Sequence, residues 1–275
     1  MTKMEFAQAV AEVVGGEAKE VTRTNGVKRI GICVGDGNIR PNIYIEEMYL
    51  KEMSIEDAAE EVKRIANANA NPDIDVSGII NYESIKEKLS LRLYNVKTPA
   101  EICQSAEEYG FDDLILVPYV EVGRDKDGMM SVRVTNQLVE SWGVTKAKVI
   151  DDAFKNTKAS GNFKVRSMRD TLVEMMGEEA ASMLPEEDDI PQMLTITNSN
   201  KMFGALGAII CAKELAERFK NGYFIIPSSI HECIAISRNG ADAESLASMI
   251  KKVNETQVLP EEVLGWHAYE FEGVA

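Results

Sequence analysis

The sequence predicts an α+β fold, mainly antiparallel sheet with hairpins and packed helices. Segments with the two-residue alternation of a strand are joined by short polar turns, as in hairpins. Helical segments are interspersed irregularly, and few strand–helix–strand units occur. Two Thr-Asn pairs, at 135–136 and 197–198, each end a predicted strand before a helix, which adds the hypothesis of two similar subdomains.

Helices are predicted where apolar residues recur every three to four positions behind a capping residue. Thr2 and Glu5 occupy the two positions of a capping box, and Ser54 and Asp57 repeat that arrangement. Pro99 stands at the first helical position, which favours proline. The predicted helices cover residues 2–14, 54–69, 98–109, 136–142, 145–158, 170–183, 207–219 and 243–253.

Strands are predicted where apolar and polar residues alternate or β-prone residues cluster. Asn25-Gly26 between two such segments is the strongest short hairpin signal, because both central turn residues favour positive φ. The polar turn at 123–128, GRDKDG, joins a second predicted hairpin. The predicted strands cover residues 18–24, 27–34, 89–96, 114–122, 129–134, 163–167, 193–197, 223–227, 230–237 and 268–271, the last as an edge strand.

The acidic loop 185–191, PEEDDIP, is the candidate boundary within the chain. One alternative is an N-terminal α+β portion, residues 1–184, packed with a C-terminal α+β portion, residues 192–275. The other is a single domain over residues 1–275, with the loop as a solvated connection. Loops of this length are usual in compact domains, which favours the connection.

The composition is that of an acidic protein, with 45 acidic and 30 basic residues and a net charge of −15. This charge disfavours nucleic acid as a partner, because sequence-independent binding requires clustered Lys and Arg. It is compatible with a basic protein partner, with mimicry of a phosphate backbone, or with solubility alone.

The expected location is cytoplasmic, without membrane association. No apolar segment has the length of a membrane span, and Glu5 and Gln8 interrupt the apolar core that a signal peptide needs. No two cysteines form a Cys-x-x-Cys pair, so free thiols are expected in a reducing compartment. The four are Cys33, Cys103, Cys211 and Cys233.

The catalytic candidates lie in one short segment and are Ser228, Ser229, His231 and Glu232. They combine the side-chain types of a nucleophile, a base and an orienting carboxylate. A serine hydrolase needs a hydrogen bond between Ser and His and donors for the oxyanion, and adjacency in sequence does not supply that geometry. The sequence favours the alternative, a polar turn that fixes a strand crossing.

The binding candidates are Thr197, Asn198, Gly204, Asp112 and Asp113. The first three precede the predicted helix 207–219, where free backbone amides could bind an anion. The two aspartates precede a strand and, with a histidine, would suit magnesium or manganese. Nothing in the spacing demands a metal, so no metal site and no cofactor are predicted.

Several short motifs occur in an order that resembles a bacterial family of unknown function, itself distantly similar to the YtpQ-like family. The motifs are Met4-Glu5-Phe6, Pro41 to Glu46, Asp113-Leu114, Val134 to Asn136, Trp142 to Val144, Thr197-Asn198, Gly204-Ala205 and Pro227 to Glu232. The resemblance spans nearly the whole chain. It implies no activity and no catalytic residue, and it implies an association with mobile elements.

Two classes of function follow. The favoured one is a non-catalytic binding or regulatory protein with an acidic surface. The alternative is a hydrolase that uses Ser228 or Ser229 with His231 and a carboxylate. In a hydrolase, His231 is expected in a cleft, within hydrogen-bond distance of a serine or a carboxylate. The oligomeric state is left open.

Overall fold

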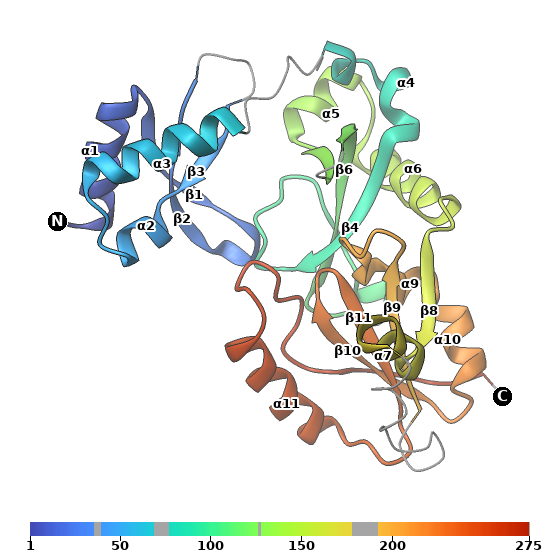
Figure 1. Cartoon of the computed structure of the whole chain (residues 1–275). Coiled ribbons are helices and arrows are strands. Elements are labelled where there is room, and N and C mark those ends of the chain that lie inside the picture. The colour runs from blue at the N-terminus through green and yellow to red at the C-terminus, as the bar shows by residue number, and fades with distance from the viewer. Residues whose placement is uncertain (36–39, 69–76, 126–127, 178–191, 275) are drawn as a thin grey trace. The chain divides into compact units, whose positions relative to one another are not determined.

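The computed structural model describes residues 1–35, 40–68, 77–125, 128–177 and 192–274, and it confirms the α+β class (Figure 1). Its strands form three sheets, and the strand pairs described are all antiparallel. The chain divides into two compact units, Met1–Gly78 and Ile79–Ala275. The predicted boundary at residues 185–191 lies outside the described residues and stays a prediction.

The first unit is a three-stranded sheet, in the order β1-β2-β3, with helices packed on it. Phe6 and Val10 of the first helix are buried together with Ile32 and Ile43 of the sheet and Val62 of the last helix. The elements are α1 (Lys3–Val14), β1 (Glu17–Thr22), the 3₁₀ turn η1 (Thr24–Gly26), β2 (Lys28–Cys33), β3 (Asn42–Tyr44), α2 (Glu46–Leu50) and α3 (Ile55–Ala68).

Local signals explain much of this unit. The capping box between Thr2 and Glu5 is present at the start of α1. The Asn25-Gly26 turn joins β1 to β2, and both residues have positive φ, 59° and 71°. The predicted helix start and hairpin are therefore confirmed.

The second unit begins with a sheet in the order β4-β6-β5, with β7 paired to β6. Its elements are the 3₁₀ turn η2 (Ser77–Ile80), α4 (Tyr82–Ile85), η3 (Lys86–Lys88), β4 (Leu89–Asn95), β5 (Gln104–Ser105), η4 (Glu107–Tyr109), β6 (Leu114–Asp125), β7 (Gly128–Arg133), α5 (Asn136–Trp142) and α6 (Lys146–Ala159). The predicted helix 98–109 is wrong, because this segment contributes the short strand β5 to the edge of the sheet.

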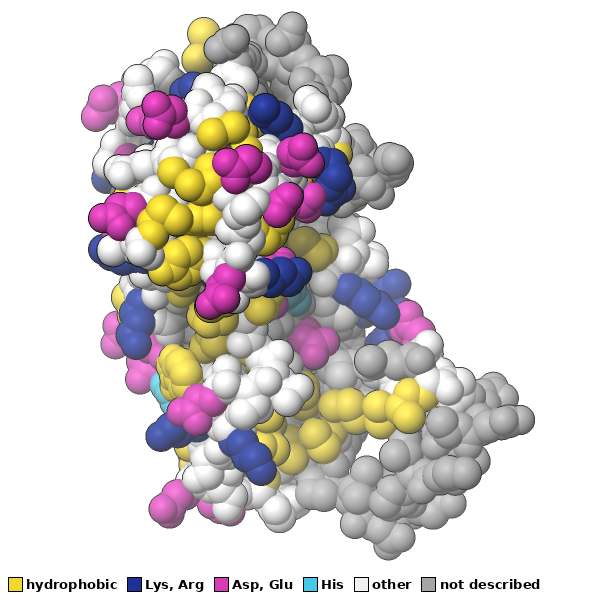
Figure 2. Space-filling model, turned by 60° about the vertical axis from the view of Figure 1, so that its left-hand side comes forward, with side chains coloured by type: hydrophobic (Ala, Val, Ile, Leu, Met, Phe, Trp, Pro, Cys, Tyr) yellow, Lys and Arg dark blue, Asp and Glu magenta, His cyan; other side chains and the backbone are white. Residues whose placement is uncertain are grey.

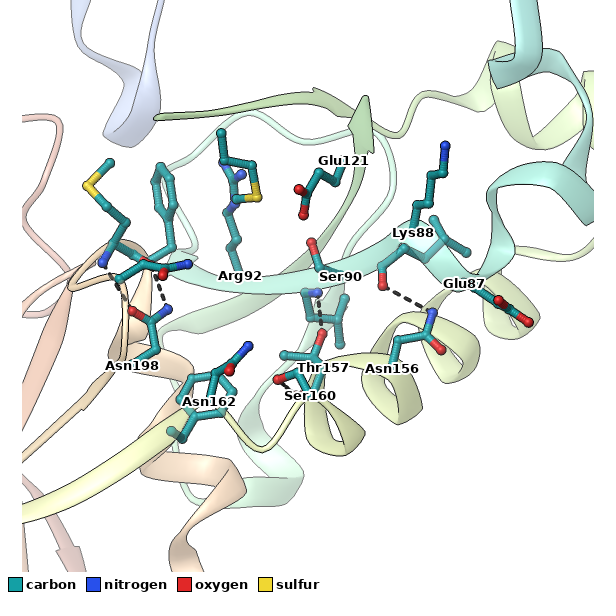
Figure 3. A pocket seen from close by; sticks show the side chains of 17 residues that line it. Glu87, Lys88, Ser90, Arg92, Glu121, Asn156, Thr157, Ser160, Asn162 and Asn198 are labelled. Atoms are coloured by element: carbon teal, nitrogen blue, oxygen red, sulfur yellow. Dashed lines mark hydrogen bonds between the residues drawn. The ribbon is translucent and has the colours of Figure 1, made fainter. Parts of the chain in front are cut away.

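The helix α6 covers one face of β4. Thr157 of α6 accepts a hydrogen bond from the amide of Leu91, and Asn156 donates to the carbonyl of Leu89. Because side chains alternate along a strand, Ser90 and Arg92 point to the opposite face. Figure 3 shows them on the side of β4 away from α6.

The second sheet of this unit has the order β12-β10-β11-β9-β8. Its elements are β8 (Phe163–Ser167), α7 (Met168–Met176), β9 (Met193–Asn198), the 3₁₀ turn η6 (Gly204–Leu206), α9 (Gly207–Ile210), α10 (Ala212–Arg218), β10 (Tyr223–Ser229), β11 (Glu232–Ser237), α11 (Ala243–Thr256) and β12 (Tyr269–Phe271). Phe224 and Ile226 of β10 pack against α11, whereas Tyr223 and Ile225 point into the main core. The edge strand β12 is confirmed.

Two sequence expectations about this sheet are corrected. The predicted helix 207–219 is interrupted at Cys211, which separates α9 from α10. The predicted strand 230–237 begins only at Glu232, because Ile230 and His231 form the turn after β10. The predicted helix 170–183 corresponds to α7, and the last part of that segment lies outside the described residues.

The surface drawn in Figure 2 carries scattered acidic side chains, with Lys and Arg between them and apolar side chains among them. Within the described residues, no helix combines the length and the apolar character needed to cross a bilayer.

Candidate functional site

The catalytic candidates lie together at the turn between β10 and β11, but the serines do not contact the imidazole. The Ser228 hydroxyl donates to Oε1 of Glu232 at 3.1 Å. The Ser229 hydroxyl accepts from the backbone amide of His231, also at 3.1 Å. No hydrogen bond among the described residues joins either hydroxyl to the His231 ring. The two serines therefore stabilise the turn.

The His231 side chain, 22% exposed, contacts two other segments. Its Nδ1 accepts a hydrogen bond from the amide of Phe203 at 3.1 Å, and its Nε2 lies 3.4 Å from Oε1 of Glu262. An imidazole nitrogen that accepts from an N–H carries no proton, so the neutral ring has its proton on Nε2, facing Glu262. The imidazole thus connects the loop that precedes η6 to the segment before Val263.

Three binding candidates gather around the same turn. The carbonyl of His231 accepts from the Thr197 hydroxyl at 2.9 Å and from the Gly204 amide at 3.0 Å. Asn198 pairs with both backbone groups of Met202, at 3.1 Å to the amide and 2.7 Å to the carbonyl. These contacts shape the loop 199–203, in which Lys201 and Phe203 have positive φ.

The loop places Phe203 against the buried guanidinium of Arg92. The guanidinium carbon lies 3.8 Å from the centre of the Phe203 ring and 4.0 Å from that of Tyr119. Arg92 is only 6% exposed, and its Nη2 donates to the Ser131 hydroxyl at 2.6 Å. No carboxylate among the described residues forms an ion pair with Arg92.

A cavity of about 200 Å³ lies beside this arginine (Figure 3). The cavity lies between β4 with the end of α6 on one side and the loop after β9 on the other. Polar and apolar groups share its lining about equally; the polar side chains include Lys88, Ser90, Arg92, Glu121, Asn162 and Asn200, and the apolar ones include Phe203. Among the predicted site residues, Asn198 lines it.

Asp112 and Asp113 lie elsewhere, next to His267, and do not line the cavity. One ligand atom from each of these three residues lies within 4.8 Å of the others, so the group could hold a divalent cation. However, Asp113 accepts hydrogen bonds from the Tyr269 hydroxyl at 2.5 Å and from Asn95 at 3.4 Å. Asp112 lies 3.4 Å from Nε2 of His267.

Sequence reasoning missed Arg92, Phe203 and Ser90. Ser90 and Arg92 alternate with Leu89, Leu91 and Leu93 in a predicted half-buried strand, so both were consistent with a solvated face. The signal that could have singled out Arg92 is its position between two leucines, two residues before Tyr94.

The structure is that of an α+β protein whose second unit carries a cavity lined in part by a buried arginine. The chain belongs to a family of unknown function (DUF5688), whose family model matches residues 2–273. No curated protein and no solved structure matches the chain. Membership of a family of unknown function is thus confirmed, whereas the similarity to the YtpQ-like family stays a prediction.

Proposed function

We propose that the protein is a non-catalytic binding protein whose second unit takes a small polar ligand in the cavity beside Arg92. The observation that carries this proposal is a guanidinium that is 6% exposed, lines a cavity and has no carboxylate partner among the described residues. Ligand sites typically combine a concave surface with a few polar groups placed to orient the ligand.

The position of Arg92 is costly without a ligand. Burial of an ionised group costs free energy unless the group is paired and hydrogen-bonded. The two aromatic rings offset part of this cost, because a cation over a desolvated ring gains about 2 kcal/mol. Of the five N–H donors of a guanidinium, one donates to Ser131, and the Tyr94 hydroxyl is a second polar neighbour of the group. The remaining donors are left for a ligand.

The geometry favours binding over the hydrolase alternative. Nucleophilic catalysis by Ser228 or Ser229 would require a hydrogen bond to the His231 ring. The hydroxyls contact Glu232 and a backbone amide instead. Nδ1 of His231 is already occupied by the amide of Phe203. These contacts support a structural role for the two serines, and the carboxylate that the His231 ring approaches is that of Glu262, at 3.4 Å from Nε2.

A basic protein partner is the second part of the proposal. It is supported by the net charge of −15 and would account for a regulatory role. A pull-down with the purified protein is expected to retain basic proteins at low salt and to release them as salt is raised. The association with mobile elements rests on the family resemblance alone.

The ligand-binding proposal is tested by blocking the cavity. We expect Ser90→Trp to fill it, and Ser105→Trp, on the exposed edge strand β5 of the same sheet, is the matched control. Both variants and the wild type are screened by thermal shift against sugars, amino acids, hydroxy acids, nucleosides and sugar phosphates. We expect at least one compound to raise the melting temperature of the wild type and of Ser105→Trp only, and to be recovered unchanged. If no compound discriminates Ser90→Trp from the control, the proposal is wrong.

A further inference from the structure

We infer that the ligand of this cavity is a small hydroxylated monocarboxylate whose carboxylate meets the edge of the Arg92 guanidinium. The inference rests on the proposed function, since it names the class of ligand for the same cavity. It follows from the remaining donors of Arg92, from the charged side chains around the cavity, and from the size of the cavity and the neutral polar groups in its lining.

The aromatic rings limit how an anion can approach Arg92. Phe203 and Tyr119 lie over the guanidinium at 3.8 and 4.0 Å, so its flat surface is occupied by rings. The remaining N–H groups point outward in the plane of the guanidinium. Two parallel N–H groups in that plane match the two oxygens of a carboxylate, and such bidentate pairs are short and directional. Arg92 is therefore suited to an anion that binds edge-on.

The charges around the cavity favour a single negative charge on the ligand. Two cationic side chains, Lys88 and Arg92, line it together with two acidic ones, Glu87 and Glu121. A monocarboxylate places one negative charge beside Arg92. A phosphate monoester carries about −1.5 to −2 charges at pH 7 and would place a larger negative charge near Glu87 and Glu121.

The rest of the lining suits hydroxyl groups. Ser90, Asn162 and Asn200 offer neutral groups that both donate and accept hydrogen bonds. The volume of about 200 Å³ is below the range of roughly 300–1,000 Å³ that is typical of sites for drug-sized ligands. It corresponds to about seven water molecules at roughly 30 Å³ each, which suits a hydroxy acid of about three to six carbons.

The test compares carboxylates with uncharged and phosphorylated counterparts. The probes are lactate and lactamide, gluconate and gluconamide, and glycerol 3-phosphate. Each is titrated into the full chain, and binding is followed by the ¹⁵N resonance of the Arg92 side-chain Nε–H. We expect gluconate or lactate to shift this resonance. The affinity for the matching amide should be lower by about tenfold or more, because the amide cannot form the charge-assisted pair.

Variants separate the arginine from the cavity. Arg92→Lys keeps the charge but loses the two-pronged geometry, so carboxylate affinity should fall about tenfold or more. Arg133→Lys is the matched control, because Arg133 also contacts Tyr119 but does not line the cavity. The affinity of this variant for the carboxylate should stay within about twofold of the wild-type value. The comparison of acid with amide in the wild type does not depend on the folding of either variant.

The outcomes distinguish the proposed function, which is ligand binding in this cavity, from the inference that the ligand is a carboxylate. If glycerol 3-phosphate or an amide binds as tightly as the acids, the ligand class is wrong. If Ser90→Trp abolishes binding while Arg92→Lys leaves it unchanged, the proposed function stands and the inference about carboxylates fails. If neither variant affects the binding of any probe, the proposed function fails as well.

Discussion

The ring of Phe203 lies 3.8 Å from the guanidinium carbon of Arg92, while its amide donates to Nδ1 of His231 at 3.1 Å. One residue therefore connects the wall of the cavity to the turn between β10 and β11. Phe203 has a φ of 55°, a left-handed conformation that costs a bulky residue about 1–3 kcal/mol. Its contacts to Arg92 and His231 compensate for this cost, so the shape of the cavity depends on that turn.

We predict energetic coupling between Phe203 and Arg92. In a double-mutant cycle with Phe203→Leu and Arg92→Met, the coupling energy should be about 0.5–2 kcal/mol, because leucine keeps an apolar contact but removes the ring. Urea unfolding of the four proteins measures it. A cycle between Phe203→Leu and Arg64→Met is the control, since Arg64 is an exposed residue of α3 paired with Glu61. Additive effects in the first cycle would contradict the prediction.

Gly204 is predicted to tolerate no side chain. A Cβ at this position would lie 2.6 Å from the amide nitrogen of Asn198 and 2.6 Å from the carbonyl oxygen of His231. Because both are backbone atoms, Gly204→Ala should force a shift that costs about 1–3 kcal/mol or more. Gly78→Ala, where nothing lies within 4 Å, should be nearly neutral. Thermal unfolding of both variants makes the comparison, and equal melting temperatures would refute it.

The elements that the sequence predicts correctly are those with local causes. The capping box at Thr2 and Glu5 and the Asn25-Gly26 turn depend only on residues a few positions apart. The helix expected after Pro99 failed because that segment pairs with β6 as the short strand β5. Such strand pairing depends on residues far away in the sequence, so it cannot be predicted from local propensity.

The candidate site shows the same limit. The sequence brings Ser228, Ser229, His231 and Glu232 together because they are adjacent, and the structure keeps them in one turn. The sequence alone could not show that the His231 ring accepts a hydrogen bond from the amide of Phe203, which lies in a different segment. Arg92 was missed for a related reason, since its burial comes from Phe203 and Tyr119, which other strands and loops bring to it.

The cysteines are predicted to differ in reactivity. Burial, together with the nearby carboxylate of Glu214, raises the pKa of the Cys211 thiol to about 11, whereas Cys103 is exposed. At pH 8 only about one Cys211 in a thousand is a thiolate, so iodoacetamide should label Cys103 first. Burial also raises the pKa of Cys233, which should stay unlabelled while the protein is folded.

Mass spectrometry of the labelled peptides measures these rates. Raising the pH from 8 to 10 should increase the thiolate fraction of Cys211 about a hundredfold, and its labelling with it. In urea, all four cysteines should react. Rapid labelling of Cys211 at pH 8 in the folded protein would contradict the buried environment.

The hydrogen bond between Tyr269 and Asp113 is predicted to stabilise the second unit. Tyr269→Phe should lower the free energy of unfolding at pH 7 by about 1.5–3 kcal/mol, because the hydroxyl donates to a carboxylate at 2.5 Å. Tyr223→Phe is the comparison, since burial alone raises the pKa of that hydroxyl and no hydrogen bond joins it to another described residue. Denaturant unfolding at pH 7 makes the measurement.

The same tyrosine predicts a pH dependence. Burial raises the pKa of Tyr269 above its usual value near 10, and Asp113 raises it further. A folded-state pKa above the unfolded value gives stability that is complete below pH 10 and is lost as the pH rises further. The wild type should therefore lose stability more steeply than Tyr269→Phe above pH 10. Parallel curves for the two proteins would be inconsistent with a buried, hydrogen-bonded hydroxyl.

The last prediction separates a structural His231 from a catalytic one. The side-chain oxygen of asparagine can occupy the position of Nδ1, so His231→Asn should keep the hydrogen bond from the amide of Phe203. His231→Gln places its polar atoms nearer the position of Nε2, and His231→Ala provides no acceptor. Both should lose about 1–3 kcal/mol of unfolding free energy, because the amide is left without its partner.

Ligand titrations of the same three variants complete the test. If the imidazole serves to hold Phe203 over Arg92, His231→Asn should bind the acids that the wild type binds, and His231→Ala should bind them more weakly. A general base has a different requirement, since it must accept and release a proton, which an asparagine amide does not do near neutral pH. A hydrolase would therefore lose turnover equally in His231→Asn and His231→Ala. Retention of both stability and binding by the asparagine variant alone would identify His231 as the residue that positions the cavity wall.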